Sequence, residues 1–249
     1  MIEKIDLELI KEIALEAGNA IMEIYKKDFQ VDYKDDKSPL TEADIKSNEI
    51  ICSALNKLFP NIPILSEENK EVTYKERKDW EYYWCIDPID GTKEFVKRNG
   101  EFTVNIALIH NKVPILGVVY APVLQDMYSS KKGLGAFKNS TKLPIKRDDD
   151  KYIIIASKSH MSKETQEFVD NIKTLKEKEL ISKGSSLKLC LVAEGKADIY
   201  PRLAPTMEWD TAAAHAIVLE ANKDVVEFES KDTLKYNKEN LLNPWFVVL

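Results

Sequence analysis

The stretch 84-WCIDPIDGTKEF-95 places two aspartates three residues apart, with a proline between them and Gly-Thr directly after. The run before it is aromatic and β-branched, so we expect a strand that ends just before Asp87. The proline restricts Asp87 to an extended backbone, and the turn that follows lets Asp90 point back toward it. Two carboxylates and the carbonyl oxygen of Ile89 form an all-oxygen group that suits a hard cation such as Mg²⁺.

Gly91 and Thr92 follow, and Lys93-Glu-Phe-Val is typical of the first turn of a helix. The exposed N–H groups at the start of a helix bind phosphate well, so one short stretch would supply both metal ligands and a phosphate site. Asp-Pro and Asp-Gly are also common turn dipeptides, and Asp90 could cap a helix. Spacing alone leaves both interpretations open.

Two further groups of acidic residues bear on this choice. Glu67 and Glu68 directly follow the apolar run at 62–65, and Asp210 stands at the start of the helix expected over 211–221. That helix is almost entirely apolar and should be buried, and a buried aspartate needs polar partners or a cation. The structural alternatives are a solvated loop for the glutamates and a helix cap for the aspartate.

The composition bounds the class of protein. The chain has 249 residues, 44% of them hydrophobic, which is enough for one large domain or two lobes of about 120 residues. Its net charge of −6 argues against binding of polymeric nucleic acid, although a local cluster or a bound metal could still hold a small anion. The three cysteines are odd in number and show no C-x-x-C spacing. This favours a reducing compartment and argues against a thiolate zinc site.

The N-terminal residues carry acidic groups throughout, and no window reaches about 18 uninterrupted apolar residues. We therefore expect no signal peptide and no transmembrane segment, and a cytoplasmic location.

The N-terminal half predicts two helices followed by short strands. Apolar residues recur at helical spacing over 5–26, and a second helix is expected from Glu42 to Phe59, where Pro60 stops it. Thr41 and Asp44 have the form of a capping box at its start. Strands are expected over 62–65, 82–86, 102–110, 115–122, 127–130 and 135–139.

The charged run at 146–151 is the expected boundary between two lobes, 1–147 and 151–249, of one 249-residue unit. Strands and helices alternate irregularly, which predicts a layered α/β (α+β) fold rather than a doubly wound sheet. Beyond the boundary we expect a strand over 152–157, a charged helix over 162–178, a helix over 185–195 that ends in Gly195, and a strand over 197–201.

Together, 87-DPIDGT-92, the upstream Ser-Glu-Glu and the Trp-Asp before the Ala-rich helix resemble the signature of the inositol monophosphatase superfamily of lithium-sensitive phosphatases. Within it, DGTKEFVKRNGEFTVNIALI, ILGVVYAPV, GSSLKLCLVAEGKADIYPR and WDTAAAHA look similar to the CysQ-type 3′(2′),5′-bisphosphate nucleotidases. The resemblance extends to 243-NPWF-246, and DGTKEF differs from the DGTTNF usual in inositol monophosphatases.

The resemblance implies a layered αβαβα sandwich and Mg²⁺-dependent removal of the 3′-phosphate of adenosine 3′,5′-bisphosphate (PAP), which gives AMP and phosphate. It implies two to three Mg²⁺ ions and the activation of a water molecule by Asp44 and Thr92. Asp44 also fits the capping box, and its carboxylate cannot use the same lone pairs twice, so the water-positioning role is favoured. The implied metal ligands are Glu67, Asp87, the carbonyl of Ile89, Asp90 and Asp210.

The resemblance also implies how the nucleotide is held. Ser185, Lys188 and Arg202 would contact the nucleotide and its second phosphate, since a dianion favours fixed cations. His160 would pack near the base, and Lys34 would face the phosphates; a solvated lysine and loop residues are the alternatives. The full implied substrate set is Glu67, Asp90, Gly91, Thr92, His160, Ser185, Lys188, Arg202 and Asp210.

Alternatives share parts of this site. An inositol monophosphatase or fructose-1,6-bisphosphatase would use the same metal ligands, a nucleotide sensor would bind PAP without turnover, and a structural protein would carry the acidic cleft by accident. The resemblance further implies a role in recycling PAP from sulfate assimilation. It leaves open whether PAPS is also hydrolysed to APS and whether the protein associates with the inner face of the membrane without a span. The sequence leaves the oligomeric state unknown.

Overall fold

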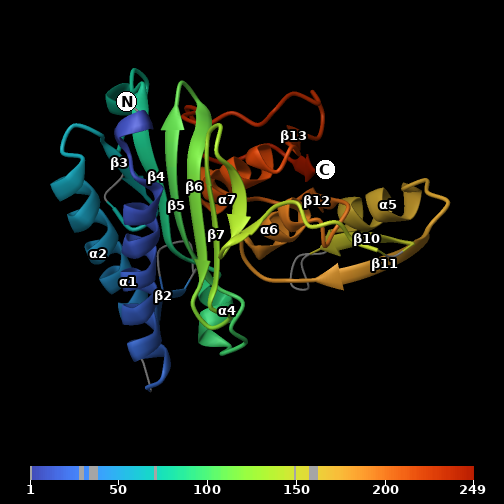
Figure 1. Cartoon of the computed structure of the whole chain (residues 1–249), viewed down its shortest axis with the longest axis horizontal. Helices are drawn as coiled ribbons and strands as arrows, with labels where there is room; N and C mark the ends of the chain where they lie inside the picture. The colour runs from blue at the N-terminus through green and yellow to red at the C-terminus, as the bar shows by residue number, and fades with distance from the viewer. Residues whose placement is uncertain (1, 28–30, 34–38, 70–71, 149, 157–161) are drawn as a thin grey trace.

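The computed structural model describes residues 2–27, 31–33, 39–69, 72–148, 150–156 and 162–249, and the statements below concern these residues. Helices and strands stack in five alternating layers, helix, sheet, helix, sheet, helix (Figure 1). This confirms the expected layered αβαβα sandwich of the α/β (α+β) class. Within the described residues, no helix is long and apolar enough to cross a membrane.

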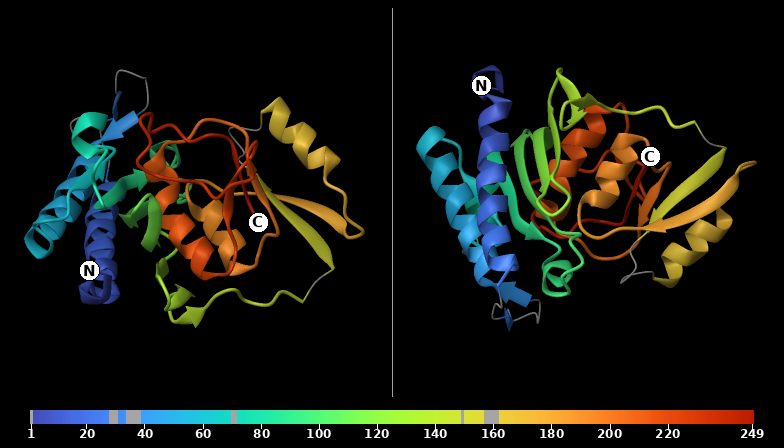
Figure 2. Two further views of the ribbon diagram at one scale, coloured as in Figure 1. Left: turned by 90° about the horizontal axis from the view of Figure 1, so that it is seen from above. Right: turned by 60° about the horizontal axis from the view of Figure 1, so that its bottom comes forward.

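The outer helical layer consists of α1 (Leu7–Tyr25) and α2 (Glu42–Leu58), which lie side by side on one face of the large sheet (Figure 2). The apolar stripe of α1 is buried, as its helical periodicity predicts. The 3₁₀ turn η1 (Ile2–Lys4) precedes α1, and the short pair β1 (Val31–Tyr33) and β2 (Pro39–Thr41) precedes α2.

The large sheet has the strand order β3-β4-β5-β6-β7-β8-β9. Only β3 and β4 pair in parallel, and the other neighbours in this sheet are antiparallel. The short helices α3 (Tyr74–Arg77) and α4 (Thr92–Val96) lie on either side of β4 in the chain. The strands are β3 (Ile64–Ser66), β4 (Tyr82–Asp90), β5 (Thr103–His110), β6 (Val113–Ala121), β7 (Asp126–Lys131), β8 (Gly135–Lys138) and β9 (Thr141–Lys142).

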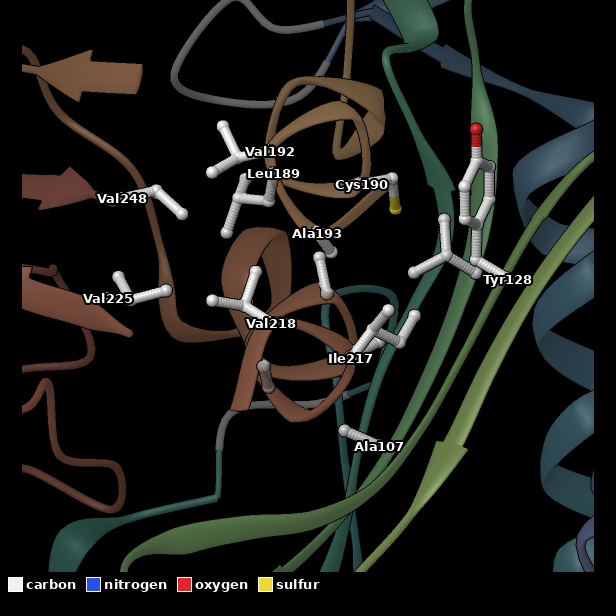
Figure 3. Close-up of a cluster of buried hydrophobic side chains, with 14 of the residues drawn as sticks. Ala107, Tyr128, Leu189, Cys190, Val192, Ala193, Ile217, Val218, Val225 and Val248 are labelled. Carbon is white, nitrogen blue, oxygen red and sulfur yellow. The ribbon is translucent and has the colours of Figure 1, made fainter. Parts of the chain in front are cut away.

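The middle helical layer consists of α6 (Leu187–Glu194) and α7 (Glu208–Glu220). The α7 helix packs against β4 to β8 on one side and α6 on the other, so it is buried on most of its surface. Figure 3 shows the side chains of both helices meeting those of the sheet. The approach is close, because a Cβ atom on Gly117 in β6 would lie 2.1 Å from the Ala213 carbonyl oxygen. Small residues at this contact explain the alanine-rich sequence of α7.

The C-terminal layers contain two small sheets and one helix. The strands β10 (Lys151–Ala156) and β11 (Glu177–Ser182) pair in parallel, and β14 (Phe246–Val248) lies between β12 (Tyr200–Arg202) and β13 (Val225–Glu227). The helix α5 (Lys163–Asn171) forms the outermost layer.

The helix expected over 162–178 is wrong in its second half. It ends at Asn171, and residues 177–182 form β11 instead. The charged sequence of β11 carries no clear strand period, and its parallel pairing with β10 decides its conformation. The last helix also starts earlier than expected, since Met207 is the N-cap and Asp210 lies in the first turn.

Candidate active site

The parallel pairing of β3 with β4 brings two predicted ligands to one edge of the sheet. Ser66 stands opposite Ile86, and the N–H of Glu67 extends the ladder by donating to the Ile86 carbonyl at 3.2 Å. Glu67 directly follows β3, whereas β4 continues past the strand end expected before Asp87 and includes both Asp87 and Asp90. Because parallel strands run in the same direction, Glu67 and Asp87 lie side by side at one edge of the sheet.

A β-bulge in β4 brings Asp87 and Asp90 to the same side of the strand. Asp87 pairs with Asn105 and Asp90 pairs with Thr103, so two residues of β4 oppose one residue of β5. Side chains three residues apart point to opposite faces of a regular strand, and the extra residue reverses that relation. Pro88 lies in the bulge, where its missing N–H costs no ladder hydrogen bond.

The third acidic residue comes from the opposite side of the site, on α7. Carboxylate oxygens of Glu67, Asp87 and Asp210 all lie within 4.8 Å of one another. One oxygen of Asp210 accepts a hydrogen bond from the Met207 N–H at 2.8 Å. Three carboxylates distant in the sequence therefore converge. The expectation that Asp210 is the N-cap is wrong, because Met207 is the N-cap and Asp210 is the third helical residue, which bonds back to it.

The converging carboxylates repel one another in the absence of a cation. Burial raises the pKa of Asp87 well above its usual value, and the charges of Glu67, Asp90 and Asp210 raise it further. Burial and the nearby Asp90 raise the pKa of Asp210 to about 8. A group of oxygen ligands held this close, with few compensating cations, fits a hard divalent cation such as Mg²⁺.

Asp90 lies beside this cluster and is held by its neighbours. Its Oδ2 accepts hydrogen bonds from the N–H and the hydroxyl of Ser186 at 2.5 Å and 2.7 Å. The carbonyl oxygen of Ile89 lies 3.3 Å from Thr92 Oγ1, and the Ile89 N–H donates to Asp87 Oδ1 at 3.1 Å. Asp90 and the carbonyl of Ile89, the two other predicted metal ligands, therefore lie close to the acidic cluster.

Asp44 takes part in two contacts through two different oxygens. Its Oδ2 accepts from the N–H and hydroxyl of Thr41 at 2.8 Å and 2.6 Å, which completes the capping box of α2. Its Oδ1 accepts from the Thr92 hydroxyl at 3.2 Å. The capping box and the pairing with Thr92 therefore coexist, because each uses a separate oxygen.

A pocket of 120 Å³ opens next to Asp90 and Asp210, and Gly91, Ser185, Lys188 and Arg202 contribute to its lining. The Lys188 ammonium donates to the Ser185 carbonyl at 2.6 Å. Burial lowers the pKa of Lys188 to about 8, although the nearby Asp90 opposes this shift. Within the described part of the chain, Ser185 Oγ and Arg202 Nε are buried without a hydrogen-bond partner. Such unpaired polar groups favour a polar or anionic ligand in the pocket.

Two expected residues cannot be placed. His160 and Lys34 lie outside the described residues. Two residues at the site were not predicted, Ser186 and Asn105, although each touches Asp90. Asn105 had a signal in the sequence, because it is the polar residue inside the apolar strand FTVNIALIH.

Comparison with known proteins gives the family. The model of the inositol monophosphatase family matches residues 4–245 of the chain. The chain belongs to the inositol monophosphatase family. Family members named 3′(2′),5′-bisphosphate nucleotidase CysQ are similar over nearly their full length. The one from Salmonella typhimurium is 46% identical over 248 residues, with 97% of this chain and 98% of that protein covered. The one from Escherichia coli K12 is 45% identical over 247 residues, with the same coverage.

Solved structures of family members share the fold. CysQ from Bacteroides thetaiotaomicron superposes with a TM-score of 0.89 at 46% identity, covering 97% of this chain and 96% of that chain. An inositol monophosphatase from Thermotoga maritima gives a TM-score of 0.79 at 25% identity, covering 97% and 91%. The resemblance found in the sequence is confirmed.

Proposed function

We propose that this protein is a Mg²⁺-dependent 3′(2′),5′-bisphosphate nucleotidase that hydrolyses the 3′-phosphate of PAP to give AMP and phosphate. The observation that carries the proposal is the convergence of Glu67, Asp87 and Asp210 beside a pocket that holds Lys188 and Arg202. The first group fits a cation and the second fits an anion. The names of the relatives, which share nearly half of their residues with this chain, support the nucleotide as substrate.

The proposed metal ligands would hold two to three ions. When bound, Mg²⁺ neutralises phosphate oxygens and makes water acidic enough to attack near neutral pH. The ligands are Glu67, Asp87, the carbonyl of Ile89, Asp90 and Asp210.

Thr92 and Asp44 would position the attacking water. The Thr92 hydroxyl donates its hydrogen to Asp44 Oδ1 at 3.2 Å, which leaves the lone pairs of Oγ1 to accept a hydrogen from water. A water that donates a hydrogen to Thr92 keeps its own oxygen lone pairs free to attack the phosphorus atom. The N–H groups of Gly91 and Thr92 would donate to phosphate oxygens and stabilise their charge during the reaction.

The pocket would hold the rest of the nucleotide. We assign the second phosphate to Lys188 and Arg202, with the hydroxyl of Ser185 as a further donor, because fixed cations recognise a dianion well. His160 is proposed near the base. In this assignment the lobe 1–147 supplies most metal ligands, and the lobe 151–249 supplies the nucleotide contacts together with Asp210.

The test is phosphate release from PAP, AMP, inositol 1-phosphate and fructose 1,6-bisphosphate, with Mg²⁺ and with EDTA. We expect a strong preference for PAP that EDTA abolishes. Preference for inositol or fructose phosphate would leave the metal assignment standing and overturn the substrate assignment. Release from none of them would favour the nucleotide sensor.

The same assay extends to PAPS, where release would give APS. Some expectations stay predictions: a role in recycling PAP from sulfate assimilation, a cytoplasmic location, and association with the inner face of the membrane.

A further inference from the structure

Ser186 occupies an unusual position for a serine at the start of a helix. It is the N-cap residue of α6, yet its side chain makes no capping hydrogen bond to that helix. Serine is favoured at this position because its oxygen normally accepts from an N–H in the first turn. The hydroxyl of Ser186 is therefore used elsewhere.

That hydroxyl instead contacts two of the proposed metal ligands. Ser186 Oγ lies 2.7 Å from Asp90 Oδ2 and 2.8 Å from the carbonyl oxygen of Asp210. The Ser186 N–H also donates to Asp90 Oδ2 at 2.5 Å. One residue thus links the end of β4 with the first turn of α7, and it is 1% exposed.

Asn105 fixes which way the serine hydroxyl points. Its Nδ2 donates to Ser186 Oγ at 2.9 Å and lies 3.4 Å from Asp90 Oδ2. The Thr103 hydroxyl donates to Asn105 Oδ1 at 3.0 Å, which sets the orientation of the amide. Since Ser186 Oγ accepts from Asn105, its single hydrogen goes to one of the two remaining acceptors. The charged carboxylate of Asp90 is the stronger one.

Only one of the two carboxylate oxygens of Asp90, Oδ2, is engaged in these hydrogen bonds. Ser186 and Asn105 surround Oδ2, and no hydrogen bond reaches Oδ1 from the residues that the structure describes. The side chain cannot rotate without losing these contacts, so Oδ1 has a fixed position from which it can serve as a ligand.

We propose that Ser186, oriented by Asn105, is a positioning residue that holds Asp90 with Oδ1 available to the metal. This rests on the metal site of the proposed function. Hydrogen bonds that orient a ligand typically contribute a factor of about 10 to 100 in metal affinity or activity. Ser186 touches no reacting atom in this assignment, and its effect is transmitted through Asp90.

The test is Mg²⁺ and Mn²⁺ binding to the full-length, metal-stripped protein, measured by titration calorimetry. We expect Ser186→Ala to weaken binding about 10- to 100-fold. The matched control is Ser130→Ala in β7, since Ser130 is also fully buried but its hydroxyl has no partner within the described residues. The control should bind as the wild type does. Equal affinity of the two variants would overturn the proposal.

PAP hydrolysis provides a second readout. For Ser186→Ala, the half-saturating Mg²⁺ concentration should rise by the same factor, while kcat recovers at high Mg²⁺ and KM for PAP changes little. A purely structural role would lower the melting temperature and leave the Mg²⁺ dependence unchanged, which would contradict the proposal.

Asn105→Ala keeps the proposal testable if Ser186→Ala does not fold. It should weaken metal binding in the same direction, because Nδ2 contacts both the serine and the aspartate, and unchanged affinity would count against the proposal. A wild-type protein that binds neither metal would be a different result. It would overturn the metal site on which the proposed function depends.

Discussion

Asp44 shows at the scale of a single residue how one side chain serves both fold and site. The sequence offered the capping box and the water-positioning role as competing interpretations. In the structure Oδ2 completes the cap with Thr41, while Oδ1 accepts from Thr92. Burial raises the pKa of Asp44, and the hydrogen bonds from Thr41 and Thr92 oppose that shift. The same residues that start α2 therefore keep a carboxylate next to Thr92.

Replacing Thr92 by valine tests the water-positioning role. The change keeps the shape of the side chain and removes the hydroxyl that donates to Asp44 at 3.2 Å. We expect kcat for PAP to fall about 10²- to 10⁴-fold with KM within a few-fold. Thr92→Ser should retain most activity, and calorimetric melting should show that both variants fold. A valine variant with near wild-type kcat would refute the assignment.

The buried amine of Lys188 predicts a pH dependence. Its pKa is lowered to about 8 by burial, so in the free enzyme it loses its proton as pH rises through 8. Because only the charged form binds a phosphate strongly, kcat/KM for PAP should fall above pH 8, by about tenfold or more.

Lys188→Arg is the matched control for this profile, since arginine stays charged across the range. We compare the ratio of kcat/KM for PAP in the variant to that in the wild type at each pH, which cancels the effect of the metal site on both proteins. This ratio should rise above pH 8, because only the wild type loses the charge. Identical pH profiles for the two proteins would exclude Lys188 as the titrating group.

At the scale of elements, the contact between α7 and β6 sets the position of Asp210. A Cβ atom on Gly117 would lie 2.1 Å from the Ala213 backbone oxygen, whereas one on Gly18 in α1 would meet the Tyr120 ring at 2.4 Å. A ring can turn aside more easily than the backbone of a buried helix can move. The two glycines therefore differ in what a methyl group displaces.

Gly117→Ala should cost about 1–3 kcal/mol of unfolding free energy through overpacking. Gly18→Ala should cost less, because its neighbour is a side chain. Urea unfolding of both variants measures the difference, and Gly117→Ala should also weaken Mg²⁺ binding because α7 carries Asp210. A larger loss of unfolding free energy for Gly18→Ala than for Gly117→Ala would contradict this, and would show that the sheet can shift to accommodate the displaced α7.

At the scale of the whole molecule, the acidic cluster joins layers that are far apart in sequence. Glu67 follows β3 and Asp87 lies in β4 of the large sheet, whereas Asp210 lies in α7 of the middle helical layer. A cation bound to all three would hold these layers together and offset the burial and the repulsion that together raise the pKa of Asp87. Metal binding should therefore stabilise the entire fold and not only the site.

Mg²⁺ at about 100 times its dissociation constant should add about 2.7 kcal/mol of stability. For a chain of this size, that raises the melting temperature by about 5–10 °C. Asp87→Asn should lose this increase, and its metal-free form should be at least as stable as the wild type because a buried charge is removed. Thermal scans with Mg²⁺ and with EDTA measure both effects; an undiminished Mg²⁺ shift in the variant would contradict the ligand assignment.

The sequence alone determined most of the local structure and identified the acidic residues that the fold brings together. Apolar periodicity located α1 and α2, alternating runs located the central strands, and Gly195 marked the end of α6, because these features depend on neighbours along the chain. The acidic residues that carry the proposal were also recognisable from the elements expected next to them, although Asp87 lies within β4 and Asp210 within the first turn of α7.

Only the tertiary structure decided which atoms meet. β11 became a strand because β10 lies beside it, and Ser186 reached Asp90, 96 residues away, because the N-cap of α6 lies beside the end of β4. The bulge that turns Asp90 toward Asp87 depends on the pairing of β4 with β5. Such contacts join segments distant in sequence, and their geometry follows from the packing of whole layers, which no local pattern of residues encodes.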